Sequence, residues 1–311
     1  MVLRKMSPAQ PFAAVSEARA LLLGEGVVRD IDSGLTCLHR AADAGDAEAT
    51  NLLATLTASG AWMLQDWPRA LDLLQRAAQL GSASARGQLE CLAPDKDDWA
   101  MRRSAIDLEA WLTPPARRSL CDSPRVRQVD AFIPSAVCDW LVGLGKDKLR
   151  PAMMVEGYGA APRLTRERTN SDFVFTIFDA DCVVALVRAR ISAMLSLPVG
   201  AMEPPQIFHY DTGQELRPHV DYLQREGRPS GYDGDRIATF LIYLNDDFEG
   251  GQTWFSRVDL SARPAKGGAL YFANVDPTGR PDPMSLHAGL PPTRGEKWLF
   301  SQWIHDRPFA G

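Results

Sequence analysis

The sequence of 311 residues lacks the features that mark several large classes of protein. No apolar run approaches the roughly 18 residues of a membrane-spanning helix. The opening MVLRKMSPAQPFAAV has no sustained apolar core before Pro11, so we expect no signal peptide. Lysine and arginine are not clustered and the net charge is −5, which argues against nucleic-acid and membrane-surface partners. The composition, with 45% hydrophobic and 23% charged residues, is that of a globular protein.

Cysteine and histidine are both scarce, at five residues each. No two cysteines form a C-x-x-C pair, so neither a metal-binding knuckle nor a disulfide framework is indicated. Scattered thiols favour a reducing, cytoplasmic location, in which each cysteine is a small buried apolar residue. Two of the histidines, His219 in RPHVDYL and His287 in SLHAG, lie by contrast in similar strand-like settings.

The chain is longer than one usual domain, and its two parts differ in pattern. The first third is helical and repeats: HRAADAGDAEATNLLA (His39 to Ala54) returns as QRAAQLGSASARGQLE (Gln75 to Glu90). Each copy predicts a helix, a glycine that ends it in the left-handed conformation, and a second helix. The alanines would allow the helices to approach closely.

A linking helix follows, with Asp95 as its expected N-cap. The stretch TPPARRSLCDSP (Thr113 to Pro124) ends it, because proline cannot lie inside a helix. Beyond it we expect one strand, a helix capped by Ser135, a second helix and then a series of short strands between glycine, proline and aspartate clusters. These strands are PQIFHYD, RPHVDYL, RIATFLIYLND, GQTWFS, GGALYFAN, SLHAG and KWLFSQWIH. The predicted organisation is helical repeats over 12–93, a linker helix and proline-rich connection over 94–125, and a β sandwich or barrel over 126–311.

His219 and Asp221 lie two residues apart in a strand pattern, so their side chains would project from the same face. His287 is the natural third ligand. An H-x-D pair alone is common by chance, and a lone histidine is more often a core or surface residue. Together, two histidines and one carboxylate form the facial set of non-haem iron(II) oxygenases, which leaves coordination positions open.

Lys297 begins the last strand pattern, KWLFSQWIH. A buried lysine without a partner is costly, so an inward Lys297 implies an anion. A 2-oxoacid that chelates iron would place its far carboxylate there, and Tyr210 and Thr253 would add hydroxyl hydrogen bonds. The open positions on the metal would accept this cosubstrate and then dioxygen.

The N-terminal copies resemble the Sel1-like subgroup of tetratricopeptide repeats, in which R-A-A, a glycine and a later alanine mark the helix–turn–helix. The resemblance implies a protein or peptide partner for the repeats. The alternative is a helical cap that packs only on its own chain.

From about residue 126 to 311 the chain resembles the prolyl 4-hydroxylase branch of the 2-oxoglutarate and iron(II)-dependent dioxygenases. The matching stretches are HYDTGQELRPHVDYL, RIATFLIYLNDDFEGGQTWF, KGGALYFANVDPTGRPDPMSLHAG and RGEKWLFSQWIH. The resemblance implies a double-stranded β-helix, or jelly roll, with flanking helices, so that the whole chain is an α+β multidomain protein. It implies Fe(II) on His219, Asp221 and His287, and 2-oxoglutarate on Lys297 with Tyr210 and Thr253.

The same resemblance implies dioxygen as cosubstrate, ascorbate as reductant, and a substrate groove formed by Arg236, Trp303 and His305. Family members that act on peptides often carry a tyrosine three residues before the first iron histidine, where this chain has Leu216. Arg236, Trp303 and the N-terminal repeats favour a prolyl residue in a peptide or protein as substrate, whereas Leu216 allows the alternative, a free amino acid or natural-product intermediate. A non-catalytic repeat scaffold or oxygen sensor is the third interpretation. It would be favoured if one of the metal-ligand residues were missing from the sequence, but all three are present.

Overall fold

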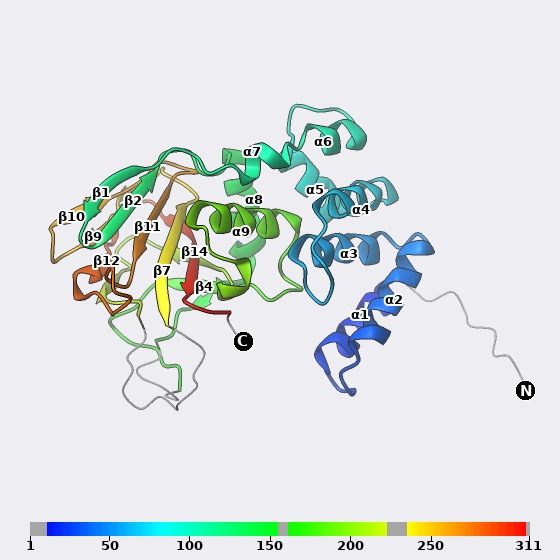
Figure 1. Ribbon diagram of the computed structural model, residues 1–311, viewed down its shortest axis with the longest axis horizontal. Coiled ribbons are helices and arrows are strands. Elements are labelled where there is room, and N and C mark those ends of the chain that lie inside the picture. The colour runs from blue at the N-terminus through cyan, green and yellow to red at the C-terminus, as the bar shows by residue number, and fades with distance from the viewer. Residues whose placement is uncertain (1–10, 155–160, 223–234, 309–311) are drawn as a thin grey trace, which may run out of the picture. The chain divides into compact units, whose positions relative to one another are not determined.

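The computed structural model describes residues 11–154, 161–222 and 235–308, which gather into two units (Figure 1). One unit contains the described residues up to Trp111 together with Ile177–Val187, and the other contains Leu112–Thr176 and the residues from Arg188 onward. The first is helical and the second is built on β-sheets, which confirms the predicted fold class. The bounds 12–93, 94–125 and 126–311 stay predictions. Among the described helices, none is long and apolar enough to cross a membrane.

The helical unit consists of consecutive helices joined by short turns. Its helices are α1 (Pro11–Leu23), α2 (Ile31–Asp43), α3 (Ala47–Ser59), α4 (Trp67–Leu80), α5 (Ala83–Leu92), α6 (Trp99–Ala105) and α7 (Leu108–Leu112). Between α2 and α3, Gly45 has a φ of 89°, and between α4 and α5, Gly81 has a φ of 107°. Glycine takes such angles without strain. The two predicted helix–glycine–helix copies are therefore confirmed.

The repeated alanines lie where the helices pack against one another. Ala42 and Ala49 of the first copy are 3% and 0% exposed, and Ala78 and Ala85 of the second are both 0% exposed. Leu53 packs in the same buried cluster as Ala42 and Ala49. Burial of one such leucine contributes roughly 1.5–3 kcal/mol, so the repeats have an apolar core of their own.

Two expected helix caps are wrong. Helix α6 is capped by Asp98 rather than Asp95, because the Asp98 carboxylate accepts a hydrogen bond from Met101 N–H. Helix α8 (Ser135–Gly145) includes Ser135, so Pro134 occupies the N-cap and no side chain caps the helix. Residue type identifies a segment that starts a helix, but the backbone turn before it decides which residue becomes the cap.

The second unit contains the strands. They are β1 (Arg118–Asp122), β2 (Arg125–Val129), β3 (Arg150–Pro151), β4 (Ser171–Val174), β5 (Gln206–Tyr210), β6 (Leu216–His219), β7 (Arg236–Tyr243), β8 (Glu249–Gly250), β9 (Thr253–Phe255), β10 (Leu260–Ala262), β11 (Ala269–Ala273), β12 (His287–Gly289), β13 (Pro292–Arg294) and β14 (Lys297–His305). The remaining elements are α9 (Cys182–Leu195), which begins in the helical unit, and the 3-10 turns η1 (Lys146–Lys148), η2 (Val199–Ala201) and η3 (Pro283–Ser285). Each predicted strand segment contains a strand, but β6 ends at His219, so Asp221 lies two residues beyond it rather than within the strand.

Two sheets of this unit face each other. The larger has eight strands in the order β1-β2-β11-β7-β14-β5-β4-β3, and the smaller has four in the order β10-β9-β12-β6. Phe208, Tyr243 and Phe272 of the larger sheet share one buried cluster with Leu216 and Phe255 of the smaller. Two sheets packed over a common apolar core form the sandwich that the strand pattern predicted.

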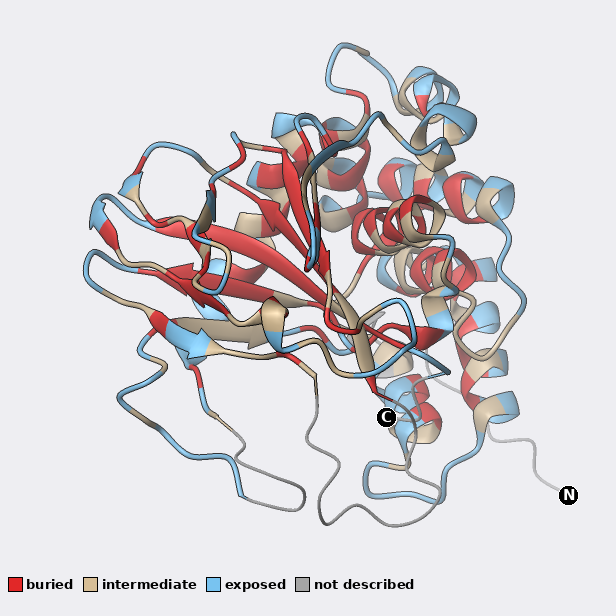
Figure 2. Cartoon of the chain, turned by 60° about the vertical axis from the view of Figure 1, so that its left-hand side comes forward, coloured by how far each residue is buried: buried red, intermediate tan, exposed pale blue. Residues whose placement is uncertain are grey.

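The strands of the sheets are largely buried (Figure 2). Strand β14 is buried along almost its whole length, and its side chains alternate between the two faces of the large sheet. Lys297, Ser301 and Trp303 line a cavity between the sheets. Gln302 faces the other way and accepts a hydrogen bond from Arg188 of α9. The period-two alternation of a strand thus directs Lys297 inward.

Candidate metal centre

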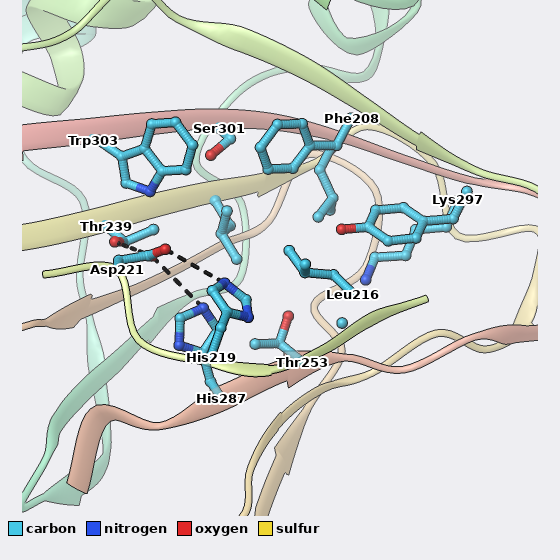
Figure 3. Close-up of a pocket in the computed structure, with 14 residues that line it drawn as sticks. Phe208, Leu216, His219, Asp221, Thr239, Thr253, His287, Lys297, Ser301 and Trp303 are labelled. Atoms are coloured by element: carbon cyan, nitrogen blue, oxygen red, sulfur yellow. Dashed lines mark hydrogen bonds and ion pairs between the residues drawn. The ribbon is translucent and has the colours of Figure 1, made fainter. Parts of the chain in front are cut away.

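His219 and His287 face each other across neighbouring strands of the small sheet (Figure 3). They are direct cross-strand partners on β6 and β12, and their ring centroids lie 4.4 Å apart. Asp221 follows β6, with Oδ1 3.4 Å from His219 Nε2 and Oδ2 3.6 Å from His287 Nε2. One ligand atom from each residue lies within 4.8 Å of the others. The fold therefore brings the three candidate ligands together.

Each of these histidines is oriented by the backbone carbonyl two residues before it. His219 Nδ1 lies 2.9 Å from Arg217 O, and His287 Nδ1 lies 2.9 Å from Ser285 O. A carbonyl oxygen can only accept, so Nδ1 of each ring is the nitrogen that carries the proton. Nε2 of each ring is directed toward Asp221. Metal-binding histidines are commonly held in this way.

Burial and mutual proximity set the protonation of these groups. Burial by itself would raise the pKa of Asp221, but the His287 and His219 rings hold it below its usual value. Burial, with the nearby His219 ring, lowers the pKa of His287 to about 4. At neutral pH the site thus offers a carboxylate and an uncharged imidazole, which are the forms that bind a divalent cation.

Two buried polar residues that the sequence analysis missed stand behind Asp221. Thr239 Oγ1 donates to Asp221 Oδ2 at 2.6 Å, and Asn274 Nδ2 donates to Thr239 Oγ1 at 3.0 Å. Thr239 is a polar residue in the apolar strand RIATFLIY, and a buried hydroxyl of this kind signals a specific partner. Nothing in the local sequence around Asn274 indicates a partner 35 residues away.

Lys297 lines the same cavity as the candidate ligands and is 0% exposed. Its Nζ has no hydrogen-bond partner among the described residues, and it lies 4.7 Å and 5.5 Å from the ring centroids of Tyr210 and Tyr243. Thr253 Oγ1 lies 2.9 Å from Tyr243 Oη. Burial lowers the pKa of Lys297 to about 7. Tyr210, Thr253 and Lys297 thus line one cavity, and the buried amine of Lys297 has no hydrogen-bond partner there among the described residues.

The three residues expected in the substrate groove also come together, around a glutamate that the sequence analysis missed. Glu203 accepts hydrogen bonds from Arg236 Nε at 2.5 Å and Nη2 at 2.9 Å, and its Oε1 lies 2.7 Å from His305 Nε2. The guanidinium carbon of Arg236 lies 3.7 Å from the ring centroid of Trp303, which lines the cavity. Burial would raise the pKa of Glu203, but the bonds from His305 and Arg236 lower it. The charge of Arg236 is thus balanced beside the cavity.

The two remaining histidines lie outside this centre. His39 is exposed on α2. His209 packs against Trp298 with ring centroids 4.3 Å apart, and its Nε2 lies 2.5 Å from Glu296 Oε2. With Asp211 these two form a second group of potential ligands. Because Asp211 and Glu296 are exposed and His209 already has a partner in Glu296, the group is explained as surface pairing.

The region of the chain that contains this site resembles known proteins. Residues 205–305 match the family described as the 2OG-Fe(II) oxygenase superfamily. Probable prolyl 4-hydroxylase 6 of Arabidopsis thaliana is 34% identical over 206 residues, which cover 60% of this chain and 71% of that protein. Prolyl 4-hydroxylase 5 of Arabidopsis thaliana is 33% identical over 205 residues, covering 60% and 70%. A solved viral collagen prolyl hydroxylase from Paramecium Bursaria Chlorella virus-1, in its 2OG complex, has a TM-score of 0.47 at 24% identity and covers 60% of this chain and 98% of its own.

Proposed function

The chain belongs to the 2OG-Fe(II) oxygenase superfamily, and from this we infer that it hydroxylates a prolyl residue in a peptide or protein, with Fe(II), 2-oxoglutarate and dioxygen. The observation that carries the proposal is one cavity lined by the His219, Asp221 and His287 side chains and by Lys297, whose amine has no hydrogen-bond partner in the described part of the chain. A metal site alone would not explain the buried lysine.

The residues present fit the groups that the family implies. Two imidazole nitrogens and one carboxylate suit Fe(II) and leave positions for other ligands. Lys297, buried and without a hydrogen-bond partner among the described residues, suits a carboxylate anion. When bound, iron and 2-oxoglutarate would supply the oxidation, in which dioxygen gives one oxygen atom to a C–H bond while 2-oxoglutarate becomes succinate and carbon dioxide.

The side chains of this chain would bind the metal and the cosubstrate, orient the substrate and exclude water from the site. His219, Asp221 and His287 would hold the metal, and Lys297 would pair with the distal carboxylate of 2-oxoglutarate. Tyr210 would donate its hydroxyl to the same carboxylate. Burial raises the pKa of Tyr210 far above neutrality, so that hydroxyl keeps its proton.

Thr253 would complete the cosubstrate site from the small sheet, next to the Tyr243 hydroxyl. Leu241 and Leu299 line the cavity with apolar surface. Apolar walls keep water away from the site, which protects the reaction from side products. Arg236, Trp303 and His305 would position the substrate at the cavity.

The Glu203–Arg236 pair supports a peptide substrate over a free amino acid. A free amino acid brings a carboxylate that needs an unpaired cation, whereas Arg236 already has two of its donors on Glu203. A prolyl residue within a chain offers only a neutral carbonyl at that position. The free amino acid or small natural product remains the second candidate, favoured by Leu216 in place of a tyrosine, and a non-catalytic scaffold or oxygen sensor is a minor one.

The remaining parts of the proposal concern the surroundings of the enzyme. Ascorbate would serve as reductant to keep the iron in its divalent state. The helical repeats would bind a protein partner, and the five scattered cysteines, four of them buried, fit the proposed cytoplasmic location. Residues 12–93, 94–125 and 126–311 would serve as repeats, linker and catalytic domain.

The test is succinate formation by the purified chain with Fe(II), ascorbate and 2-oxoglutarate, with and without a pool of proline-rich peptides. Peptide-stimulated turnover, with a gain of one oxygen on proline by mass spectrometry, is the expected result. His219→Ala, Asp221→Ala and His287→Ala should each abolish turnover and leave the helical repeats folded. Normal activity in any of the three variants would show that the replaced residue does not bind the metal. Turnover stimulated by free amino acids but not by peptides would favour the second candidate substrate.

A further inference from the structure

We propose that Asn274 is a positioning residue that acts through the hydroxyl of Thr239 to keep Asp221 a one-oxygen ligand. The inference rests on the proposed iron site and goes beyond it, because neither residue was among the predicted site residues. Its consequence is that one coordination position stays open that the second oxygen of Asp221 would otherwise fill.

The direction of the hydrogen bonds is fixed by their chemistry. Asn274, Thr239 and Asp221 are 0%, 1% and 5% exposed, so water does not compete for these bonds. The amide nitrogen of Asn274 can only donate, and it donates to Thr239 Oγ1 at 3.0 Å. A hydroxyl has one proton, and Thr239 donates it to Asp221 Oδ2 at 2.6 Å. Asn274 thus holds the hydroxyl in the rotamer that faces Asp221.

This bond makes the two oxygens of Asp221 unequal. Oδ2 carries a short charge-assisted bond from Thr239, which withdraws negative charge from it. Oδ1 lies 3.4 Å from His219 Nε2 and Oδ2 lies 3.6 Å from His287 Nε2. Because only Oδ2 is already engaged by Thr239, Oδ1 is the oxygen left to bind a cation. An octahedral ion on two imidazoles and one carboxylate oxygen has about three positions left, whereas a chelating carboxylate would leave about two. A bidentate 2-oxoacid plus dioxygen needs the larger number.

The segment that carries Asn274 also orients His287. Asn274 N–H donates to Ile237 O, which ties the end of β11 to β7, and Asn274 O accepts from Asp282 N–H at 3.0 Å. Asp282 O in turn accepts from the N–H and the hydroxyl of Ser285, whose carbonyl holds His287 Nδ1. One segment, 274–287, therefore positions two of the three candidate ligands through continuous hydrogen bonds.

The experiment titrates the full-length chain with Mn²⁺ alone and counts the water molecules on the bound ion by water-proton relaxation. We expect Thr239→Val to lower the Mn²⁺ affinity by roughly 10- to 100-fold, the usual effect of removing such a partner. We also expect the bound water to fall from about three to about two, as Asp221 becomes chelating. Thr239→Ser retains the hydroxyl and should retain both values. Asn274→Ala should have a smaller effect in the same direction.

A double mutant separates positioning from packing. If Asn274 acts through Thr239, then Asn274→Ala should change nothing further in the Thr239→Val background. Thr57→Val is the matched control, because Thr57 is 3% exposed and its hydroxyl contacts Leu53 O and Met63 Sδ within the helical unit. The Thr57→Val variant should leave the Mn²⁺ affinity and the number of water molecules on the bound ion unchanged.

Three results would overturn the proposal. One is a Thr239→Val chain that binds Mn²⁺ with unchanged affinity and water count. Another is an Asn274→Ala effect that persists in full without the Thr239 hydroxyl. The third is a wild-type chain that takes up no Mn²⁺, which would remove the metal site itself and is thereby distinguishable from the first two.

Discussion

Gly289 and Tyr210 lie against each other from opposite sheets. A Cβ built on Gly289 would lie 3.1 Å from Tyr210 Oη, closer than such atoms normally approach. The glycine of the SLHAG motif is thus explained by space: it leaves room for the tyrosine hydroxyl beside the cavity.

We predict that Gly289→Ala displaces the Tyr210 hydroxyl and raises the KM for 2-oxoglutarate several-fold, with a smaller change in kcat. The added methyl group forces the tyrosine to shift by a few tenths of an ångström. Steady-state kinetics with varied 2-oxoglutarate would measure the effect. Gly143→Ala on α8 is the control, since nothing lies within 4 Å of the position that its added Cβ would take. An unchanged KM in Gly289→Ala would mean that Tyr210 does not contact the cosubstrate.

A second prediction concerns the stability of the ligand-free protein. Lys297 is fully buried and its pKa is lowered to about 7, below its usual value of 10.5, by burial. Lys297→Met keeps the length of the side chain and removes the buried amine, so it should stabilise the ligand-free protein by about 1–3 kcal/mol. Chemical denaturation would measure the gain, and Lys146→Met, at an exposed position, should show none.

The sign of the pH dependence follows from the same pKa. Between about pH 7 and 10.5 the unfolded state holds more protons on this lysine than the folded state. The wild-type protein should therefore become more stable as the pH rises through this range. The advantage of Lys297→Met should be largest below about pH 7 and shrink above it. A constant difference between the two proteins would contradict the lowered pKa.

A third prediction concerns the affinity for 2-oxoglutarate. Below about pH 7 the free Lys297 is already an ammonium, but above it the lysine must gain a proton when the carboxylate arrives. Affinity should therefore weaken as the pH rises above 7, with proton uptake on binding. Calorimetry in two buffers of different ionisation enthalpy would measure that uptake. An arginine at this position stays charged at every pH tested. The Lys297→Arg variant should therefore take up no proton when it binds 2-oxoglutarate, whether or not its affinity equals that of the wild type.

A fourth prediction concerns the helical unit. Gln88 is 0% exposed; its Oε1 accepts a hydrogen bond from Cys182 N–H at 3.0 Å, and its Nε2 donates to Asn51 Oδ1. Gln88→Ala would leave the buried first N–H of α9 without this partner, at a cost of about 1–3 kcal/mol. Gln79→Ala, at an exposed position of α4, should change stability by less than about 0.5 kcal/mol. Equal stability of the two variants would show that the hydrogen bond from Gln88 to the start of α9 does not stabilise the protein.

Local patterns were sufficient for the elements and for the candidate ligands. KWLFSQWIH predicted a strand, and β14 is Lys297–His305. The glycine at 81 predicted a helix end, and its φ of 107° confirms it. These features depend on neighbours a few residues away, through side-chain alternation and backbone conformation. The caps of α6 and α8 were wrong because several residues in each segment are able to start a helix, and the turn before it selects one.

The sequence by itself predicted the candidate ligands and the cosubstrate lysine: His219 and Asp221 two residues apart, and His287 and Lys297 in later strand patterns. Tertiary structure alone decided that His287 pairs with His219 in register, that Glu203 balances Arg236 from 33 residues away, and that Asn274 reaches Asp221 through Thr239. These relationships join strands distant in the chain, and such pairings depend on the order of strands in the sheets. The physical reason is that a buried polar group must find a partner wherever the fold places one, and no local pattern encodes that place.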